Sequence, residues 1–314
     1  MTTLRASSVR RLGESAGALA AGFGVLTLGL TGCTALPWIP GPLRGDTSEV
    51  APPRPSPKSF SELLSEADRS RDAGDLPRAT WKYLQALRTE PGSPLPAERI
   101  GLLLLANQDY EQARINLESV VLANPDSALA RYGLGLALLQ TDDLSGAETH
   151  LTRARELDPN NVRMLIALGV LYDRRADHAA AIQLYREGLA LDPNNPDLYN
   201  NLGMSFLMSD QPTQAIQPFQ RAAKLDPRDK IARNNLGIAY GRLGWYDEAL
   251  TAFREVGAED LAQNNLGLVC YLNGEEGRAM EAFERALRLA PADRRLPIIQ
   301  NIRRLESTRE GPRP

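Results

Sequence analysis

The sequence predicts an all-α protein built from stacked helix-turn-helix units. One pattern recurs seven times in register from Phe60 to Asp293, every 34 residues apart from a single four-residue deletion. Small residues and prolines recur at fixed positions within it. A fixed period near this length is typical of arrays in which each unit buries its apolar face only against its neighbours. We therefore expect one elongated array, although 314 residues could hold two globular domains.

The repeat is defined by three columns of residues. The units are 60–93, 94–127, 128–161, 162–195, 196–229, 230–259 and 260–293. Position 8 of a unit is Gly in all but the first: Gly101, Gly135, Gly169, Gly203, Gly237 and Gly267. Position 20 is always Ala: Ala79, Ala113, Ala147, Ala181, Ala215, Ala249 and Ala279. Position 32 is Pro in all but the shortened unit: Pro91, Pro125, Pro159, Pro193, Pro227 and Pro291.

Each column has a physical reason. Two antiparallel helices approach closely only where side chains are small, so we expect Gly at position 8 to face Ala at position 20. A Gly inside a helix costs roughly 0.5–1 kcal/mol relative to Ala, and close packing must compensate for that cost. The proline ends the second helix, because it lacks an N–H and restricts the residue before it. Asn161 and Asn195, which follow such prolines, suit the cap of the next helix.

The stretch from Tyr199 to Pro227, YNNLGMSFLMSDQPTQAIQPFQRAAKLDP, resembles the tetratricopeptide repeat (TPR) family at nearly every diagnostic position. The resemblance covers about three quarters of the chain. It implies a right-handed superhelical solenoid of about seven units, closed by a C-terminal cap helix. It also implies a scaffold that binds protein or peptide segments, because the family is a binding fold with many uses.

The ends of the array and one internal deletion depart from the period. The sixth unit loses about one helical turn after Val256, where Gly257 is the expected C-cap and the stack is expected to continue. Residues 294–307 are expected to form the cap helix, and residues 308–314 a disordered tail. The residues of this helix expected to face the last unit are Ile298, Ile299, Ile302 and Leu305.

The N-terminus is interpreted as a targeting signal. Arg5, Arg10 and Arg11 precede an uncharged apolar run that ends in Leu-Thr-Gly-Cys at Cys33. This ending resembles the lipobox of bacterial lipoproteins, which implies a signal peptide over 1–32 and a lipid on Cys33. An ordinary signal peptide or a chance cysteine are the alternatives. Thr34 would then direct the protein to the periplasmic face of the outer membrane by that family's sorting rule. Residues 33–59, rich in proline, are expected to form an extended tether.

Composition argues against several other classes of function. The net charge is −3 and aromatic residues are few, so we expect no nucleic-acid partner. No catalytic, metal-binding or cofactor motif is present, and we expect no enzyme activity and no small-molecule substrate. His150 and His178 are expected to be surface residues without an Asp, Glu or Cys arranged around them. Cys270 is expected to be a small buried apolar residue.

The candidate binding surface lies on the first helix of each unit, which lines the concave face in the family that the chain resembles. Position 9 forms an apolar stripe there, and positions 5 and 6 are Asn pairs in units five to seven. The candidate groove residues are Leu136, Val170, Asn200, Met204, Leu207, Asn234, Ile238, Asn264, Leu268 and Tyr271. Exposed apolar patches often mark partner sites, and amides can bind a peptide backbone. Two alternatives remain: curvature could bury the stripe, and the Asn residues could only tie neighbouring helices together.

The combined features predict a lipid-anchored scaffold of the cell envelope. Lipobox, tether and array resemble the TadD-type lipoproteins of Flp (tight-adherence) pilus assembly, and also the pilotin lipoproteins of type IV pili. This resemblance implies a role in assembling a pilus or secretion complex. The alternative is an adaptor that regulates cell-wall synthases or hydrolases. An enzyme is a third possibility, but the repeats leave almost no sequence to hold its site.

Overall fold

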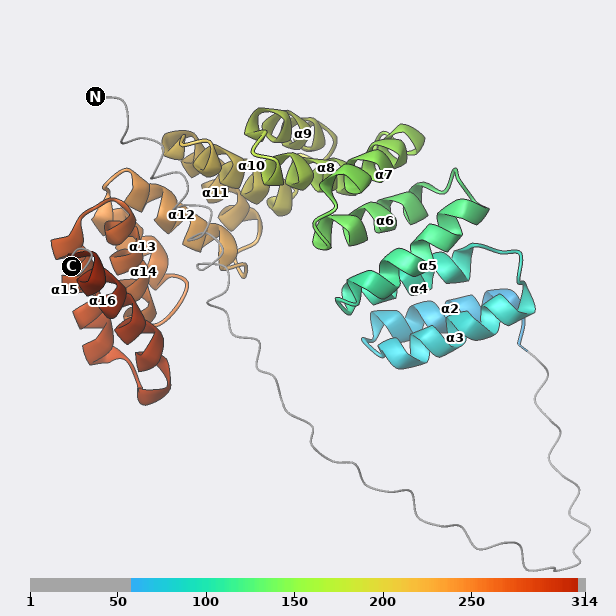
Figure 1. Ribbon diagram of the computed structural model, residues 1–314, viewed down its shortest axis with the longest axis horizontal. Helices are drawn as coiled ribbons and strands as arrows, with labels where there is room; N and C mark the ends of the chain where they lie inside the picture. The colour runs from blue at the N-terminus through green and yellow to red at the C-terminus, as the bar shows by residue number, and fades with distance from the viewer. Residues whose placement is uncertain (1–57, 310–314) are drawn as a thin grey trace, which may run out of the picture. The chain divides into compact units, whose positions relative to one another are not determined.

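The structure is a computed structural model that describes residues 58–309. In this range, fifteen α-helices and one 3₁₀ turn follow each other and no strand occurs. Figure 1 shows the helices packed as consecutive antiparallel pairs. The first five pairs are α2 (Phe60–Asp72) and α3 (Leu76–Thr89), α4 (Leu95–Ala106) and α5 (Tyr110–Ala123), α6 (Ala128–Gln140) and α7 (Leu144–Leu157), α8 (Val162–Arg174) and α9 (His178–Leu191), α10 (Pro196–Met208) and α11 (Pro212–Leu225). The remaining helices are α12 (Ile231–Arg242), α13 (Tyr246–Arg254), α14 (Glu259–Leu272), α15 (Glu276–Leu289) and α16 (Arg295–Arg309).

The seven pairs correspond to the seven predicted units, and they stack as a solenoid. Each helix packs on the next one along the chain. From α4 onward, the first helix of a unit also packs on the first helix of the following unit, up to α14 on α16. In the described part of the chain, no two second helices make a comparable contact. The first helices therefore form a continuous inner layer, and the second helices stand further apart on the outside.

The glycines of position 8 allow close packing inside each unit, and the side chain nearest to them is that of position 24. A Cβ atom added to Gly203 would lie 2.6 Å from the ring of Phe219, and one added to Gly237 would lie 2.5 Å from Phe253. The same clash with position 24 occurs at Gly101, Gly135, Gly169 and Gly267. The small residue thus makes room for the large side chain of position 24. The Ala at position 20, the partner expected for this glycine, is fully buried in every unit.

The turn between the two helices of a unit has one geometry throughout. At the end of α4, the N–H of Asp109 donates to the Leu104 carbonyl and the N–H of Gln108 donates to the Leu105 carbonyl. These two bonds form a Schellman motif. The same pair of bonds closes the first helix of all seven units. The residue at position 15 has positive φ in every case: Gly74, Gln108, Asp142, Ala176, Asp210, Gly244 and Gly274.

Helix ends follow the predicted signals. Asn161 accepts a hydrogen bond from the Arg163 N–H, and Asn195 from the N–H groups of Asp197 and Leu198, so both are the predicted N-caps. The second helices end two residues before the prolines of position 32, as at Leu157 before Pro159. These local signals place the helix boundaries correctly.

The sixth unit is shortened in its second helix. The helix α13 has 9 residues, whereas α11 and α15 have 14 each. It ends at Arg254 with Glu255 as its cap, so the expected C-cap at Gly257 was wrong. The shorter connection is closed by two hydrogen bonds of 2.7 and 2.8 Å from Arg254 to Glu259. These bonds, and then one from Gln263, lower the pKa of Glu259 to about 2. As expected, the stack continues, because α13 packs on α14.

The cap helix α16 covers the last unit. Ile298 and Leu305 are buried, and Ile302 packs beside them, as predicted. The helix continues through Arg309, two residues into the segment expected to be a tail. A carboxylate of α14 also anchors it, since Arg294 donates to both oxygens of the buried Asp260 at 2.9 and 3.0 Å.

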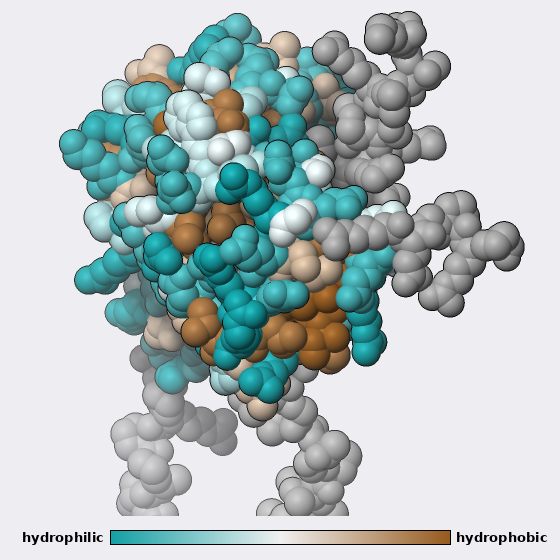
Figure 2. All heavy atoms as spheres, turned by 90° about the vertical axis from the view of Figure 1, so that its left-hand side faces the viewer, coloured by the Kyte–Doolittle hydropathy of each residue, from teal (hydrophilic) through white to brown (hydrophobic). Residues whose placement is uncertain are grey.

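Large apolar side chains also remain on the outside. Figure 2 looks onto the C-terminal side of the array and shows apolar residues gathered in one area between hydrophilic ones. Trp81, Ile115, Met208 and Trp245 are among the exposed large apolar residues. None of the described helices is both long enough and apolar enough to span a bilayer.

Candidate binding groove

The apolar stripe of position 9 lies on the inner layer of first helices. Leu136 lies on α6, Val170 on α8, Met204 on α10, Ile238 on α12 and Leu268 on α14. Leu207 and Tyr271 lie one turn further along α10 and α14. Because neighbouring first helices pack on one another, the structure brings these side chains into a row.

Every one of these seven side chains is partly buried. Each packs against a buried cluster of the array while keeping part of its surface accessible. Met208, adjacent to Leu207, is 50% exposed. The two alternatives for the stripe therefore both hold in part: it belongs to the packing of the inner layer, and it presents an apolar surface.

The Asn residues of units five to seven form a ladder between units. The Asn235 side-chain amide donates to the Asn200 Oδ1 at 2.9 Å, and that of Asn265 to the Asn234 Oδ1 at 3.1 Å. The cap helix continues the series, because Asn301 donates to the Asn264 Oδ1 at 2.9 Å. The tie between neighbouring helices, one of the two alternatives, is therefore present.

The ladder leaves one set of donors unused. Asn200, Asn234 and Asn264 accept through Oδ1, so each Nδ2 group points its two hydrogens elsewhere. No partner for these Nδ2 groups occurs among residues 58–309, and all three side chains are partly exposed. The oxygen atoms hold the units in register, and the nitrogen atoms remain available as donors at one position of three successive units.

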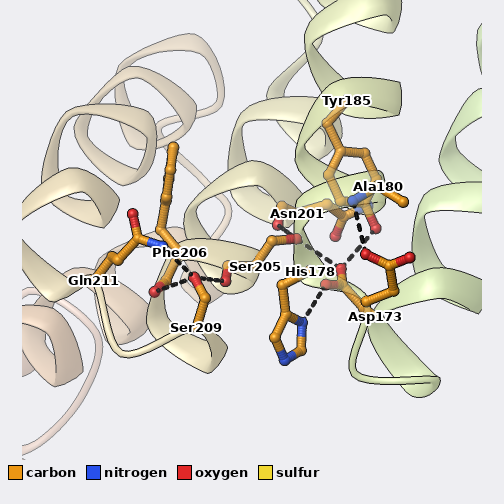
Figure 3. Close-up of polar contacts among 10 residues, drawn as sticks. Asp173, His178, Ala180, Tyr185, Asn201, Ser205, Phe206, Ser209 and Gln211 are labelled. Carbon is orange, nitrogen blue, oxygen red and sulfur yellow. Dashed lines mark hydrogen bonds and ion pairs between the residues drawn. The ribbon is translucent and has the colours of Figure 1, made fainter.

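A polar cluster joins units four and five beside this row. Asp173 of α8 accepts hydrogen bonds from the Tyr185 hydroxyl at 3.1 Å and the Ser205 hydroxyl at 2.7 Å, both on Oδ2 (Figure 3). Its other oxygen lies 2.8 Å from the His178 Nδ1. Burial, and then the charge of Asp173, raise the pKa of Tyr185 above its usual value.

The cluster corrects the expectation for His178. Its side chain is only 13% exposed and pairs with Asp173, so it is not a surface residue without an acidic neighbour. The sequence hid this contact because Asp173 and His178 lie on different helices, across the turn of unit four. The arrangement does not resemble a nucleophile with its base: Asp173 stands between Ser205 and His178, and no hydrogen bond joins those two.

Other reactive groups of the described residues are few. Burial raises the pKa of the Cys270 thiol to about 11, which fits the prediction of a small buried apolar residue. Residues 58–309 contain no group of His, Cys, Asp and Glu side chains that could hold a metal ion. Cys33, the predicted lipidation site, lies outside the described residues, as do the signal peptide and most of the tether.

Comparison with known proteins decides the family. Models of the tetratricopeptide repeat match residues 98–161, 200–260 and 261–293, and a TPR repeat model matches residues 177–209. The chain belongs to the tetratricopeptide repeat family. TPR proteins bind protein or peptide partners, so a scaffold for such interactions is the general role. No curated protein matches the chain.

Solved structures share the fold at low sequence identity. A tetratricopeptide repeat protein from Parabacteroides merdae is 17% identical with a TM-score of 0.56; the match covers 79% of this chain and 98% of that one. The Cut9–Hcn1 assembly of the APC/C matches at 18% identity and TM-score 0.56, over 78% of this chain and 46% of that one. Pseudomonas aeruginosa pilF matches at 18% identity and TM-score 0.53, over 68% of this chain and 97% of that one. At such identities the likeness is one of fold alone.

Proposed function

We propose that this TPR protein binds extended segments of other proteins along the inner layer of its first helices, as a lipid-anchored scaffold of the cell envelope. The main support for this binding site is a row of Nδ2 donors on Asn200, Asn234 and Asn264 that form no hydrogen bond among the described residues. The row lies beside a partly exposed apolar stripe. A groove of this kind offers hydrogen-bond donors and apolar surface to one ligand.

The spacing of the donors suits an extended chain. Packed helices lie about 8–10 Å apart, and one turn of a polyproline II backbone, three residues, spans about 9 Å. A bound segment can therefore present one backbone carbonyl to each Asn in turn, whatever its sequence. Its apolar side chains would then lie on Met204, Ile238 and Leu268, next to the donors.

The envelope location is supported by the sequence of the N-terminus. The apolar run that ends in Leu-Thr-Gly-Cys at Cys33 resembles a lipobox, and the Pro-rich residues 33–59 would hold the array away from the membrane. We propose a role in assembling a pilus or secretion complex, on the resemblance to TadD-type and pilotin lipoproteins. An adaptor for cell-wall synthases or hydrolases is the second candidate, because an extended segment of either partner would fit the same groove.

The groove is tested by changing two residues of the stripe together. Met204→Glu with Ile238→Glu places two charges beside the Asn donors, and we expect loss of partner capture with the array still folded. A photo-crosslinking residue at position 271, on the same stripe and partly exposed, is placed in both the native protein and the double variant in intact cells, and mass spectrometry measures the capture. The matched control is Ile115→Glu, an exposed apolar residue of the second helix α5. Undiminished crosslinking in the double variant would show that the stripe only packs the array.

The same crosslinking separates the two candidate roles. A secretin, pilin or secretion ATPase crosslinked at position 271 supports the assembly role. A wall synthase or hydrolase at that position supports the adaptor role instead.

The anchor is tested separately. Cys33→Ser removes the only thiol that a lipobox of this sequence could modify, so we expect the protein to move from the membrane to the soluble fraction. Two or more acyl chains hold a protein firmly on a bilayer, so the change should be large. Membrane fractionation followed by immunoblotting measures it, with Cys270→Ala as the control. Unchanged fractionation would contradict the lipoprotein prediction and leave the groove proposal untouched.

A further inference from the structure

Unit six is the one unit of the described array with an aromatic residue at the cap of its second helix. Asp75, Asp143 and Asp177 occupy this position in units one, three and four, and each accepts a hydrogen bond from a backbone N–H of the helix that it caps. In unit six the residue is Trp245, which is 47% exposed. It makes no side-chain cap bond, as is also the case for the cap residues of units two, five and seven. An N-cap is worth roughly 1 kcal/mol, so the tryptophan gives up local stability for a large exposed aromatic surface.

Trp245 is part of an aromatic platform with Tyr240. The two rings are stacked, with centroids 5.9 Å apart and planes at 29°. Gln220 of the preceding unit donates to the Tyr240 hydroxyl at 3.0 Å and holds that ring in place. The Tyr240 O–H and the Trp245 Nε1–H have no acceptor among the described residues, so two donors stand beside the apolar surface.

Acidic residues follow this platform in the chain. Asp247 and Glu248 follow in the first turn of α13 and are exposed. Neither carboxylate pairs with a cation in the part of the chain that the structure describes. The surface thus combines stacked aromatic rings, free N–H and O–H donors, and negative charge.

We propose that this platform binds the proline-rich segment 51–57 of a second copy of the chain. That segment, Ala-Pro-Pro-Arg-Pro-Ser-Pro, lies outside the described residues and carries one charge, on Arg54. Proline-rich segments favour the polyproline II helix, whose carbonyls have no internal partners, and aromatic grooves with nearby donors recognise that helix. Arg54 would meet the acidic side chains of α13.

The length of the chain favours a second copy as the source. Pro57 directly precedes Lys58 and unit one, and four units separate unit one from the platform. Seven residues reach at most about 25 Å, whereas four stacked units at about 10 Å each span roughly 40 Å. A neighbouring molecule has no such restriction.

Peptide binding tests the platform directly. The full chain in detergent is titrated into a fluorescent peptide of residues 49–58, and anisotropy is measured. We expect saturable binding below about 1 mM that weakens at least about tenfold in Trp245→Asp. This variant removes the ring and introduces the capping residue of units one to four, so we expect it to stay folded. Trp81→Ala, which removes an equally exposed tryptophan of unit one, leaves the affinity unchanged.

The charge contribution and the source of the segment are tested in parallel. Asp247→Arg in the chain and Arg54→Glu in the peptide should each weaken binding, and the two changes together should restore it in part. Sedimentation of the full chain should show reversible self-association that both Trp245→Asp and the triple change Pro52→Ser, Pro53→Ser and Pro55→Ser abolish. Equal peptide affinity in Trp245→Asp would overturn the platform, and self-association that survives the triple change would overturn the second copy as the occupant.

Discussion

At the scale of single residues, the closest packing in this protein occurs between position 8 and position 24 of each unit. Gly203 meets the ring of Phe219, and Gly169 meets that of Tyr185, at distances that leave no room for a Cβ atom. The large side chains are themselves fully buried. Glycine is therefore required by a neighbour on the second helix and not by its own backbone, because none of the position 8 glycines has positive φ.

Gly203→Ala tests this contact. Alanine gains about 1 kcal/mol of helix propensity, but its Cβ would lie 2.6 Å from Phe219, and overpacking a core costs about 1–3 kcal/mol. We expect a net loss of up to about 2 kcal/mol in the free energy of unfolding by denaturant titration. Gly277→Ala in α15 is the control, since no atom lies within 4 Å of its added Cβ, and it should gain about 0.5 kcal/mol. Equal effects at the two sites would contradict the packing argument.

At the scale of elements, the backbone conformation of the Schellman turn is the same in all seven units, whereas the residue type at its position 15 varies. Position 15 adopts positive φ in all seven units, yet it is Gly only in units one, six and seven. Asp and Gln occupy it in three others, and Ala176 occupies it in unit four with φ of 60°. The hydrogen bonds of the turn impose this conformation on residues that disfavour it.

Ala176→Gly should stabilise the protein. The left-handed conformation costs an L-residue roughly 1–2 kcal/mol, and this exceeds the extra entropy that glycine loses on folding. We expect a gain of about 0.5–1 kcal/mol in the free energy of unfolding, read as a higher denaturant midpoint. The same substitution at the exposed helical Ala190 should lose a similar amount. A loss at position 176 would show that the turn is not strained.

At the scale of the whole molecule, each unit is tied to the next by contacts about one repeat apart in sequence. Arg155 bonds Glu187 at 2.7 Å, and Asn273 donates to the Gly241 carbonyl at 2.6 Å. The Asn ladder belongs to the same set. Stability in such arrays is approximately a sum over units and their nearest-neighbour interfaces, so the terminal units depend on their caps.

Arg294→Ala tests the cap at the C-terminal end. The change leaves the carboxylate of Asp260, 3% exposed, without its partner. Breaking a buried ion pair costs about 3–5 kcal/mol, and we expect about 2–3 kcal/mol because the guanidinium is partly exposed. Hydrogen exchange should become faster in α14, α15 and α16 and stay unchanged in α2 to α7. Arg288→Ala, which removes a solvent-exposed pair, is the control and should have almost no effect.

The sequence by itself determined the all-α class, the seven units and the cap helix. These features depend on local signals and on a pattern that nearly every unit repeats: the caps at Asn161 and Asn195, the prolines of position 32, and the apolar spacing of 294–307. It also placed the candidate groove on the first helices, where Leu136, Val170 and Ile238 do form a row. The predicted C-cap at Gly257 was wrong because the end of α13 depends on the shortened connection to α14, which is held by the hydrogen bonds from Arg254 to Glu259.

Only the tertiary structure decided which side-chain atoms form contacts between helices and which remain without a partner. It showed that the Asn side chains bond through Oδ1 and leave Nδ2 available, that Asp173 joins His178, Tyr185 and Ser205, and that Trp245 stacks on Tyr240. The physical reason is distance along the chain. These partners lie on different helices, in several cases about 30 residues apart, and their contacts depend on how the helices pack. A repeat pattern determines that units stack, whereas the side-chain atoms that meet across the stack follow from its geometry.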